Sequence, residues 1–322
     1  MVLIIGHEFG HFSVAKMLGM RVNEFSLGMG PLLFQKEKGE TKYSVRAIPI
    51  GGFCALEGED GDSEDPRAFS KQPAWAKILV LVAGAFMNVV LGILVFTCVF
   101  VNTGVTVPKL AQVVEGKPAA EAGILPGDTI VGVNGEYYGD FASIASAIST
   151  SKGDTISITV KRDGHNKTFE CGTYVNEYGN KAVGIMASVS HNVVDCLRAG
   201  VRETGVVALS IKDFFAGLFK GNASVDDVSG IVGVVSIAGE AAEYGIINVI
   251  YLMAMISANL GYMNLLPIPA LDGGRILMTL IRAIFKDKIT DEQEGMVHAA
   301  GMILLLILMV LIMFKDTISL FK

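Results

Sequence analysis

Two histidines four residues apart, with a glutamate beside the first, are the residues of this chain best suited to chemistry. They form His7-Glu8-Phe9-Gly10-His11, inside an apolar stretch that begins at Met1. Residues four apart share one face of a helix, so both imidazoles can turn a nitrogen toward one Zn²⁺ while Glu8 stays near the metal-bound water. Zinc lowers the pKa of bound water to about 7, and a carboxylate can pass the released proton to a leaving amine. The spacing therefore indicates hydrolysis of a peptide bond.

The same residues have a plainer interpretation, in which hydrogen bonds satisfy them inside a helical bundle. Ionisable groups are costly in a membrane segment, however, and usually mark a functional site there. We therefore predict that His7 and His11 are metal ligands and that Glu8 is the catalytic acid and base. Two histidines leave zinc short of the three protein ligands typical of a catalytic site.

The third ligand must come from elsewhere in the chain, and we favour Asp272. It lies in the segment 264–274, where two prolines and two glycines should unwind the end of a helix. Irregular backbone at membrane depth is tolerated where it lines a wet cavity or is buried in protein. A solvated aspartate in a loop is the alternative role. His298 is the rival ligand and ranks second, because a lone histidine is more often a hydrogen-bonded core or interface residue.

The composition indicates a membrane protein that carries these residues. The chain has 322 residues, of which 51% are hydrophobic and 18% are charged, and its mean hydropathy is +0.51. Such a chain is too apolar for an ordinary soluble protein of this length. Three runs approach the roughly 20 residues that a bilayer core requires, and the first 20 residues, interrupted by charged groups, make a fourth. The expected fold is a polytopic α-helical membrane protein with about four transmembrane helices and an inserted mixed α/β domain.

Lys and Arg are enriched in two short regions, which marks these regions as cytoplasmic. The residues are Arg21, Lys36, Lys38, Lys42, Arg46, Arg275, Arg282, Lys286 and Lys288. Four spans then place both termini and the long region 106–245 outside. No cleavable signal peptide is recognisable, so the first span should stay in place. No basic, aromatic-interleaved stretch suggests nucleic-acid binding.

The predicted organisation follows the chain in eight segments. They are a first transmembrane helix with the zinc motif (1–20, short at its start), a cytoplasmic loop with a membrane-associated β-hairpin (21–75), a second helix (76–101), a PDZ-like domain (107–175), an external linker with an amphipathic helix (176–245), a third helix with an unwound ligand segment (246–274), a cytoplasmic loop (275–295) and a fourth helix (296–314).

The domain at 107–175 reads as short strands separated by Gly, Pro and Asp turns, with a helix near 141–149. The order of its segments at 113–119, 122–128, 130–135 and 156–160 resembles a PDZ domain, which can add a peptide strand to an exposed sheet edge. A steric spacer that holds no peptide is an equal alternative. Cys171 and Cys196 would share the external side, where they either pair or remain buried thiols.

Candidate substrate contacts lie in two regions. Asn259 and Asn264 are polar positions in an apolar span, so they either bind the substrate backbone or oxyanion or join helices by hydrogen bonds. Residues 43–53 alternate enough, with breaks at Pro49 and Gly51-Gly52, to predict a short hairpin. Its edge would hold a scissile segment extended, although a structural role is the plain alternative. Gly84 and Asn88 offer a close-contact surface on the second span.

Together, the histidine motif, Gly51-Gly52-Phe53, the element 84–88, one PDZ-like domain and the segment 264–274 closely resemble the site-2 protease family, in its bacterial regulator-of-sigma-E branch. The resemblance covers nearly the whole chain, in order. It implies a zinc-dependent intramembrane protease of the bacterial inner membrane, with His7, His11 and Asp272 on zinc, Glu8 as acid and base, and Asn264 and Asn259 near the substrate. It also implies single-span membrane proteins, such as anti-sigma factors and remnant signal peptides, as substrates. Only six residues precede the motif, fewer than in typical members.

Two other classes of protein fit the sequence less well. A membrane-embedded PDZ adaptor with a structural zinc site would need four protein ligands, and three are recognisable. A metal transporter would need a polar path across the bilayer, whereas the polar residues here gather at one end of the spans.

Overall fold

The computed structural model describes residues 1–59, 61, 63–221, 230–285 and 291–320. The chain forms two compact units, one made of Met1–Phe96 with Gly200–Lys322 and the other of Thr97–Ala199. Two lysines of the predicted cytoplasmic loop, Lys286 and Lys288, lie outside the described residues, as do the acidic Asp60 and Asp62.

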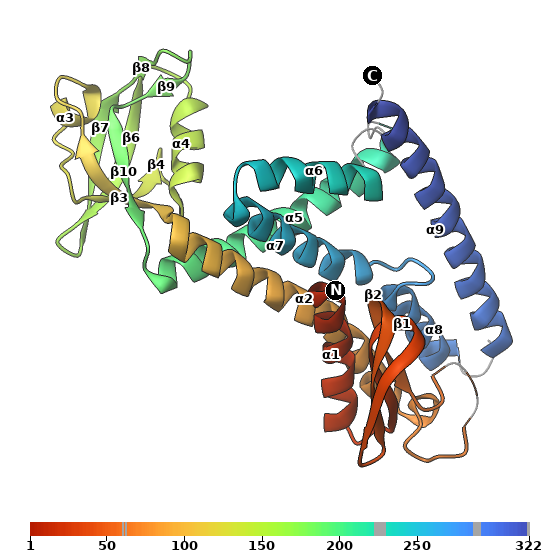
Figure 1. Ribbon diagram of the computed structural model, residues 1–322. Coiled ribbons are helices and arrows are strands. Elements are labelled where there is room, and N and C mark those ends of the chain that lie inside the picture. The colour runs from red at the N-terminus through yellow and green to blue at the C-terminus, as the bar shows by residue number, and fades with distance from the viewer. Residues whose placement is uncertain (60, 62, 222–229, 286–290, 321–322) are drawn as a thin grey trace. The chain divides into compact units, whose positions relative to one another are not determined.

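The first unit is mainly helical (Figure 1). Its helices are α1 (Val2–Met17), α2 (Ala74–Thr103), α5 (Val193–Phe219), α6 (Ile231–Glu243), α7 (Ile246–Asn264), α8 (Asp272–Phe285) and α9 (Asp291–Leu320), with α2 and α5 continuing into the second unit and a short 3₁₀ turn at Phe69–Lys71. Within the described residues, three helical stretches are long and apolar enough to cross a membrane: Ala74–Thr103, Ile246–Asn264 and Gln293–Ile318. The 16-residue α1 is not among them, so the count of four remains a prediction.

Small residues let α1, α2 and α7 approach closely. A Cβ on Gly10 would lie 2.3 Å from the carbonyl oxygen of Ala83, and one on Gly261 would lie 2.8 Å from that of Ala85. Ser257 of α7 donates a hydrogen bond to the backbone carbonyl of Asn88 at 2.8 Å. The close-contact surface predicted at Gly84 and Asn88 thus includes a hydrogen bond to the backbone of Asn88, and small residues and hydroxyl groups of this kind commonly join helices in membranes.

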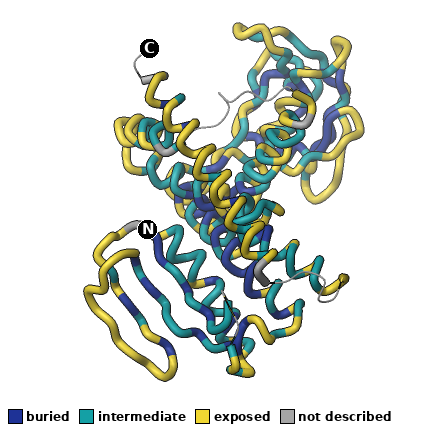
Figure 2. Tube along the Cα trace, turned by 90° about the vertical axis from the view of Figure 1, so that its right-hand side faces the viewer, coloured by how far each residue is buried: buried dark blue, intermediate teal, exposed yellow. Residues whose placement is uncertain are grey.

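The hairpin between α1 and α2 differs from the prediction. It consists of β1 (Val22–Lys38) and β2 (Thr41–Leu56), and residues 24–27 of β1 pair on one side with 42–45 and on the other with 52–55. The two parts of 43–53 therefore flank β1 instead of pairing with each other. Pro49 lacks an N–H for a ladder and Gly51 has φ +86°, and the chain crosses the middle of β1 here, where Met29 pairs with Ile48. Residues 29–38 of β1 are exposed, and Figure 2 shows exposed residues in yellow.

The segment 275–295, predicted as a cytoplasmic loop, is helical in its first part, because α8 occupies Asp272–Phe285. The irregular segment lies before it, at 265–271, between α7 and α8. Two glycines let α8 begin directly against this segment. A Cβ on Gly273 would lie 2.1 Å from the Leu266 carbonyl oxygen, and one on Gly274 would lie 2.3 Å from that of Ile268. The two glycines thus permit a tight turn into the helix that starts at Asp272.

The second unit contains a sheet in the order β10-β3-β4-β6-β7, with β5 paired to β4 and a separate pair β8-β9. The strands are β3 (Val105–Val113), β4 (Thr129–Val133), β5 (Glu136–Tyr137), β6 (Thr155–Arg162), β7 (His165–Gly172), β8 (Tyr174–Val175), β9 (Lys181–Ala182) and β10 (Ile185–Ser190), with helices α3 (Pro118–Glu121) and α4 (Phe141–Ser149). Alternating apolar positions bury one continuous core, as expected for strands with a single buried face. It includes Leu110, Ile124, Ile130, Ile144, Ile156, Ile158 and Val160.

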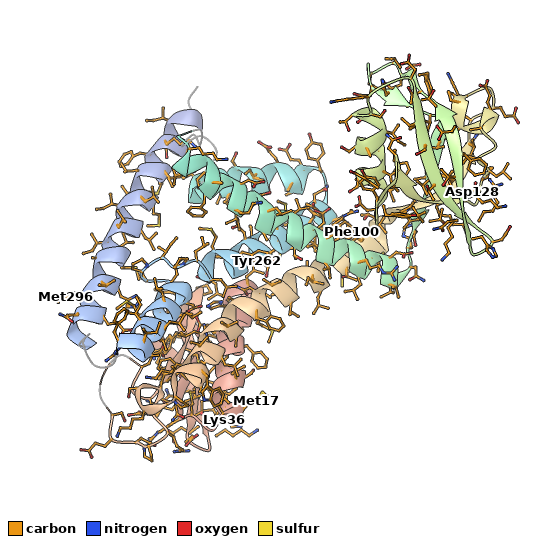
Figure 3. All side chains as sticks on the ribbon, turned by 180° about the vertical axis from the view of Figure 1, so that it is seen from behind. Met17, Lys36, Phe100, Asp128, Tyr262 and Met296 are labelled. Carbon is orange, nitrogen blue, oxygen red and sulfur yellow. The ribbon has the colours of Figure 1, made fainter. Side chains whose placement is uncertain are left out.

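One buried ion pair belongs to this unit. Asp128, labelled in Figure 3, is 2% exposed and accepts hydrogen bonds from Arg162 Nε at 2.7 Å and Nη2 at 2.6 Å. Its Oδ2 also accepts from the Leu125 amide at 2.9 Å. The Arg162 guanidinium holds the pKa of Asp128 below its usual value. Cys171 and Cys196 are buried free thiols, so the pairing considered from the sequence is not formed.

Candidate metal centre

Three electron-pair donors converge at the start of α8. His7 Nε2 lies 3.1 Å from His11 Nε2, and Asp272 Oδ2 lies 3.1 Å from the first and 3.5 Å from the second. The α-helical spacing of α1 puts both imidazoles on one face, and the turn at 265–271 brings the carboxylate to them. All three side chains are largely buried. Within the described residues, they form the one group of His, Cys, Asp and Glu with this geometry.

The hydrogen bonds of His11 fix which of its nitrogens faces the group. Its Nδ1 lies 2.8 Å from the carbonyl oxygen of Val80, and because a carbonyl only accepts, Nδ1 must donate. Nε2 of the neutral ring then carries a lone pair directed at His7 and Asp272. A second partner of this kind normally orients a metal-binding histidine.

Gly84 of α2 leaves the space that the His11 ring fills. A Cβ at this position would lie 2.3 Å from His11 Nε2 and 2.6 Å from Cε1. Any larger residue would therefore displace the ring from the group. The sequence identified Gly84 as a surface for helix contact, and the structure shows the residue that it contacts.

The donor set fits a zinc ion. Two imidazole nitrogens and one carboxylate oxygen are the ligand types found in catalytic zinc sites, which keep a further position for water or substrate. Asp272 Oδ2 is buried and accepts no hydrogen bond from the described residues. Buried acceptors in native proteins nearly always have a partner, so this oxygen is suited to bind a cation.

Glu8 is held by the hairpin. Its Oε2 accepts a hydrogen bond from the Cys54 amide at 3.0 Å, and a Cβ on Gly52 would come within 3.9 Å of its Cγ. The residues around Cys54 are paired with β1 on their other side, so this amide belongs to the outer edge of the sheet. A cavity of about 380 Å³ lies between the edge, α1, α2 and α8. Its lining includes His7, Glu8, His11, Phe53, Cys54 and Asp272.

The predicted substrate residues divide into two groups. Phe53 lines this cavity, and the buried Gly51 and Gly52 directly precede it on β2. Asn259 is exposed on α7 and Asn264 is half-buried at its last turn, and neither lines the cavity. The structure therefore brings the hairpin residues to the site and leaves the two asparagines outside its lining.

His298, the rival third ligand, lies outside the group. Its Nδ1 accepts a hydrogen bond from the Ala270 amide at 3.0 Å, and it lines a larger neighbouring cavity of about 860 Å³. Two contacts of the centre were not found from the sequence, the Val80 carbonyl and the Cys54 amide, and neither was the contact between His298 and the Ala270 amide. They are backbone groups, which every residue has, so no side-chain pattern could have identified them.

Comparison with known proteins identifies the family. The family model described as peptidase family M50 matches residues 1–308. The chain belongs to peptidase family M50, the site-2 proteases. It is 36% identical over 323 residues to a protein of Clostridium acetobutylicum named as a zinc metalloprotease, with 98% of this chain and 94% of the relative covered. It is 28% identical over 408 residues to the regulator of sigma-W protease RasP of Bacillus subtilis, with 99% and 96% covered.

Among solved structures, this M50 protease is similar to the PDZ domain of an SdrC-like protein from Listeria innocua. The sequence identity is 27%, the TM-score is 0.24, and the match covers 27% of this chain and all of the other. The family and the named relatives identify the chain as a zinc metalloprotease with Zn²⁺ as its cofactor. With three candidate spans, it is an intramembrane protease.

Proposed function

We propose that this M50 protease uses His7, His11 and Asp272 to hold zinc and Glu8 as the catalytic acid and base. One observation carries the proposal: two imidazole nitrogens and a carboxylate oxygen lie within 3.5 Å of one another, beside Glu8 and in one cavity. A zinc ion bound there supplies a Lewis acid and an acidified water at neutral pH.

The residues of the chain would divide the remaining work. Glu8 takes a proton from the attacking water and delivers it to the nitrogen of the leaving amine. The Cys54 amide, 3.0 Å from Oε2, keeps the carboxylate turned into the cavity. The Val80 carbonyl holds the His11 ring, and Gly84 leaves the ring its space. The apolar helices around the cavity limit the access of bulk water to the scissile bond.

We propose single-span membrane proteins as substrates, cut within or near their transmembrane segments. Anti-sigma factors and remnant signal peptides are the classes that we favour. The name of the B. subtilis relative, a protease that regulates sigma-W, supports the first class. A regulatory protease of this kind acts in regulated intramembrane proteolysis.

The substrate would bind extended along the outer edge of β2. A peptide bond closed into helical hydrogen bonds is hard for water to attack, and strand addition keeps it open. Gly51, Gly52 and Phe53 precede the amide that contacts Glu8, which supports a role in positioning the chain. Asn264 and Asn259 are proposed as more distant contacts, outside the cavity lining.

We propose the bacterial inner membrane as the location, with the active site toward the cytoplasm and the β-rich unit outside as a PDZ-like domain. The basic residues of the short loops support this orientation. The order of segments in the β-rich unit supports the PDZ-like assignment.

A comparison of the wild type with Glu8→Gln tests the proposal. Both proteins are purified in detergent, their zinc content is measured, and each is assayed in membranes on tagged single-span substrates. We expect Glu8→Gln to keep zinc and to lose cleavage, because the ligands remain and the proton-transfer group is gone. Zinc in both proteins with cleavage of every candidate substrate absent would favour a membrane-embedded adaptor. Full cleavage by Glu8→Gln would exclude Glu8 as the catalytic group.

A further inference from the structure

Helix α9 contacts the irregular segment that leads to Asp272. A Cβ on Gly301 would lie 2.3 Å from Pro269 Cβ and 2.9 Å from the Pro269 carbonyl oxygen, so the helix and the segment are packed without space between them. One turn earlier on the same helix, His298 reaches the next residue of the segment, Ala270. Two contacts three residues apart on α9 thus hold two consecutive residues of the segment.

Ala270 has a backbone conformation that needs such support. Its φ is +76°, in the left-handed region that residues with a Cβ rarely adopt. Its amide donates a hydrogen bond to His298 Nδ1 at 3.0 Å. Strained conformations of this kind persist when the surrounding structure holds them, and they cluster at functional sites. The conformation of Ala270 decides the direction in which the chain enters α8.

Asp272 follows two residues later and begins α8. The next residues, Gly273 and Gly274, are packed directly against the backbone of 265–269. Because this packing leaves no room for the chain to adjust, a change in the φ of Ala270 must move the Asp272 carboxylate. Its Oδ2 now lies 3.1 Å from His7 Nε2, a distance that a small rotation of the segment would lengthen.

We propose that His298 is a positioning residue for the Asp272 ligand: it holds Ala270 in the left-handed conformation that directs the carboxylate at His7 and His11. The inference rests on the proposed zinc site. It assigns His298 a role other than ligand, because its Nδ1 accepts from Ala270 and the lone pair of that nitrogen is already engaged. Outer partners of metal ligands typically change metal affinity 10- to 100-fold when they are removed.

Three variants of the full-length protein in detergent test this role, with zinc affinity measured by competition with a chromogenic chelator. His298→Leu should weaken zinc binding about 10-fold, because the acceptor is lost. His298→Asn should keep most of the affinity, since its side-chain oxygen can accept from the Ala270 amide. Ala270→Gly combined with His298→Leu should recover affinity, because glycine adopts the positive φ without support.

Two control variants distinguish a failure of the positioning role from a failure of the proposed zinc site. Val297→Ala, at the exposed neighbouring position, should leave zinc affinity unchanged. Asp272→Asn should weaken it strongly, and unchanged affinity in Asp272→Asn would instead overturn the proposed zinc site. If Asp272→Asn loses zinc while His298→Leu binds as the wild type does, the positioning role alone is wrong. The positioning role is also wrong if His298→Asn loses as much zinc affinity as His298→Leu and adding Ala270→Gly restores none of it. That result would indicate that His298 is a ligand or a packing residue.

Discussion

Asp128 and Asp272 are both largely buried, but their surroundings differ. In the β-rich unit, Asp128 has its charge and its acceptor capacity met by Arg162 and the Leu125 amide. In the helical unit, Asp272 faces two imidazole nitrogens, and its Oδ2 receives no hydrogen bond from the described part of the chain. A satisfied buried carboxylate stabilises a fold, whereas one that faces other electron-pair donors is arranged for a ligand. The surroundings of each aspartate, more than its burial, indicate its role.

The largest test of this comparison is Gly84→Ala. The added Cβ would lie 2.3 Å from His11 Nε2 and must push the ring out of the metal group. We expect zinc affinity and cleavage each to fall by about 100-fold, the upper part of the range for altered support of a metal ligand. Zinc content and cleavage of a single-span substrate measure the effect.

A matched glycine provides the control for this prediction. Gly239→Ala adds the same methyl group within α6, where, apart from the neighbouring residues and backbone of its own helix, the new Cβ would have no described atom within 4 Å. It should leave both measurements unchanged. Equal activity in the two variants would contradict the close contact between Gly84 and His11.

The second test removes the charge of the satisfied aspartate. Asp128→Asn leaves the partly exposed Arg162 guanidinium without its buried counter-charge, which should lower the stability of the β-rich unit. Hydrogen exchange of the β4 and β6 amides in the full-length protein measures the local free energy of unfolding. Zinc affinity should not change. Asp154→Asn, at an exposed position of the same unit, is the matched control. Slower exchange in Asp128→Asn than in this control would contradict a stabilising role for the Asp128 charge.

The third and smallest effect is on pH dependence. Arg162 lowers the pKa of folded Asp128 below the value in the unfolded chain, which is about 3.9. The ionised carboxylate therefore favours the fold above that pH, and this contribution is lost as the pH falls through the folded pKa. The difference in local stability between wild type and Asp128→Asn should be full at pH 6 and should shrink below about pH 4. A difference that grows on acidification would contradict the pairing.

The sequence predicted those parts of the molecule that depend on local patterns. The second helix, predicted at 76–101, lies within α2, and the helical stretch near 141–149 coincides with α4. The histidine spacing and the breaks around Asp272 selected three side chains that the structure brings together. In each case one segment carries its own signal, through helical periodicity or through Pro and Gly.

The parts that could not be predicted depend on how segments cross. Residues 43–53 alternate as a hairpin should, yet their two parts lie on opposite sides of β1. Alternation determines which face of a strand is buried, but it does not determine which strand lies beside it. The role of His298 was also hidden, because its partner is the backbone of Ala270, and an isolated histidine in an apolar helix has the same pattern as a ligand.

The three proposed metal ligands come from opposite ends of the chain, with the β-rich unit and several helices between them. Synthesis proceeds from the N-terminus, and units of structure form as they emerge. A ribosome-bound chain that ends before Asp272 therefore has two imidazoles and no carboxylate to join them. Until α9 follows, the segment before Asp272 also lacks the partner of Ala270. The proposed metal centre and its support on α9 can therefore be complete only after the last part of the chain has been made.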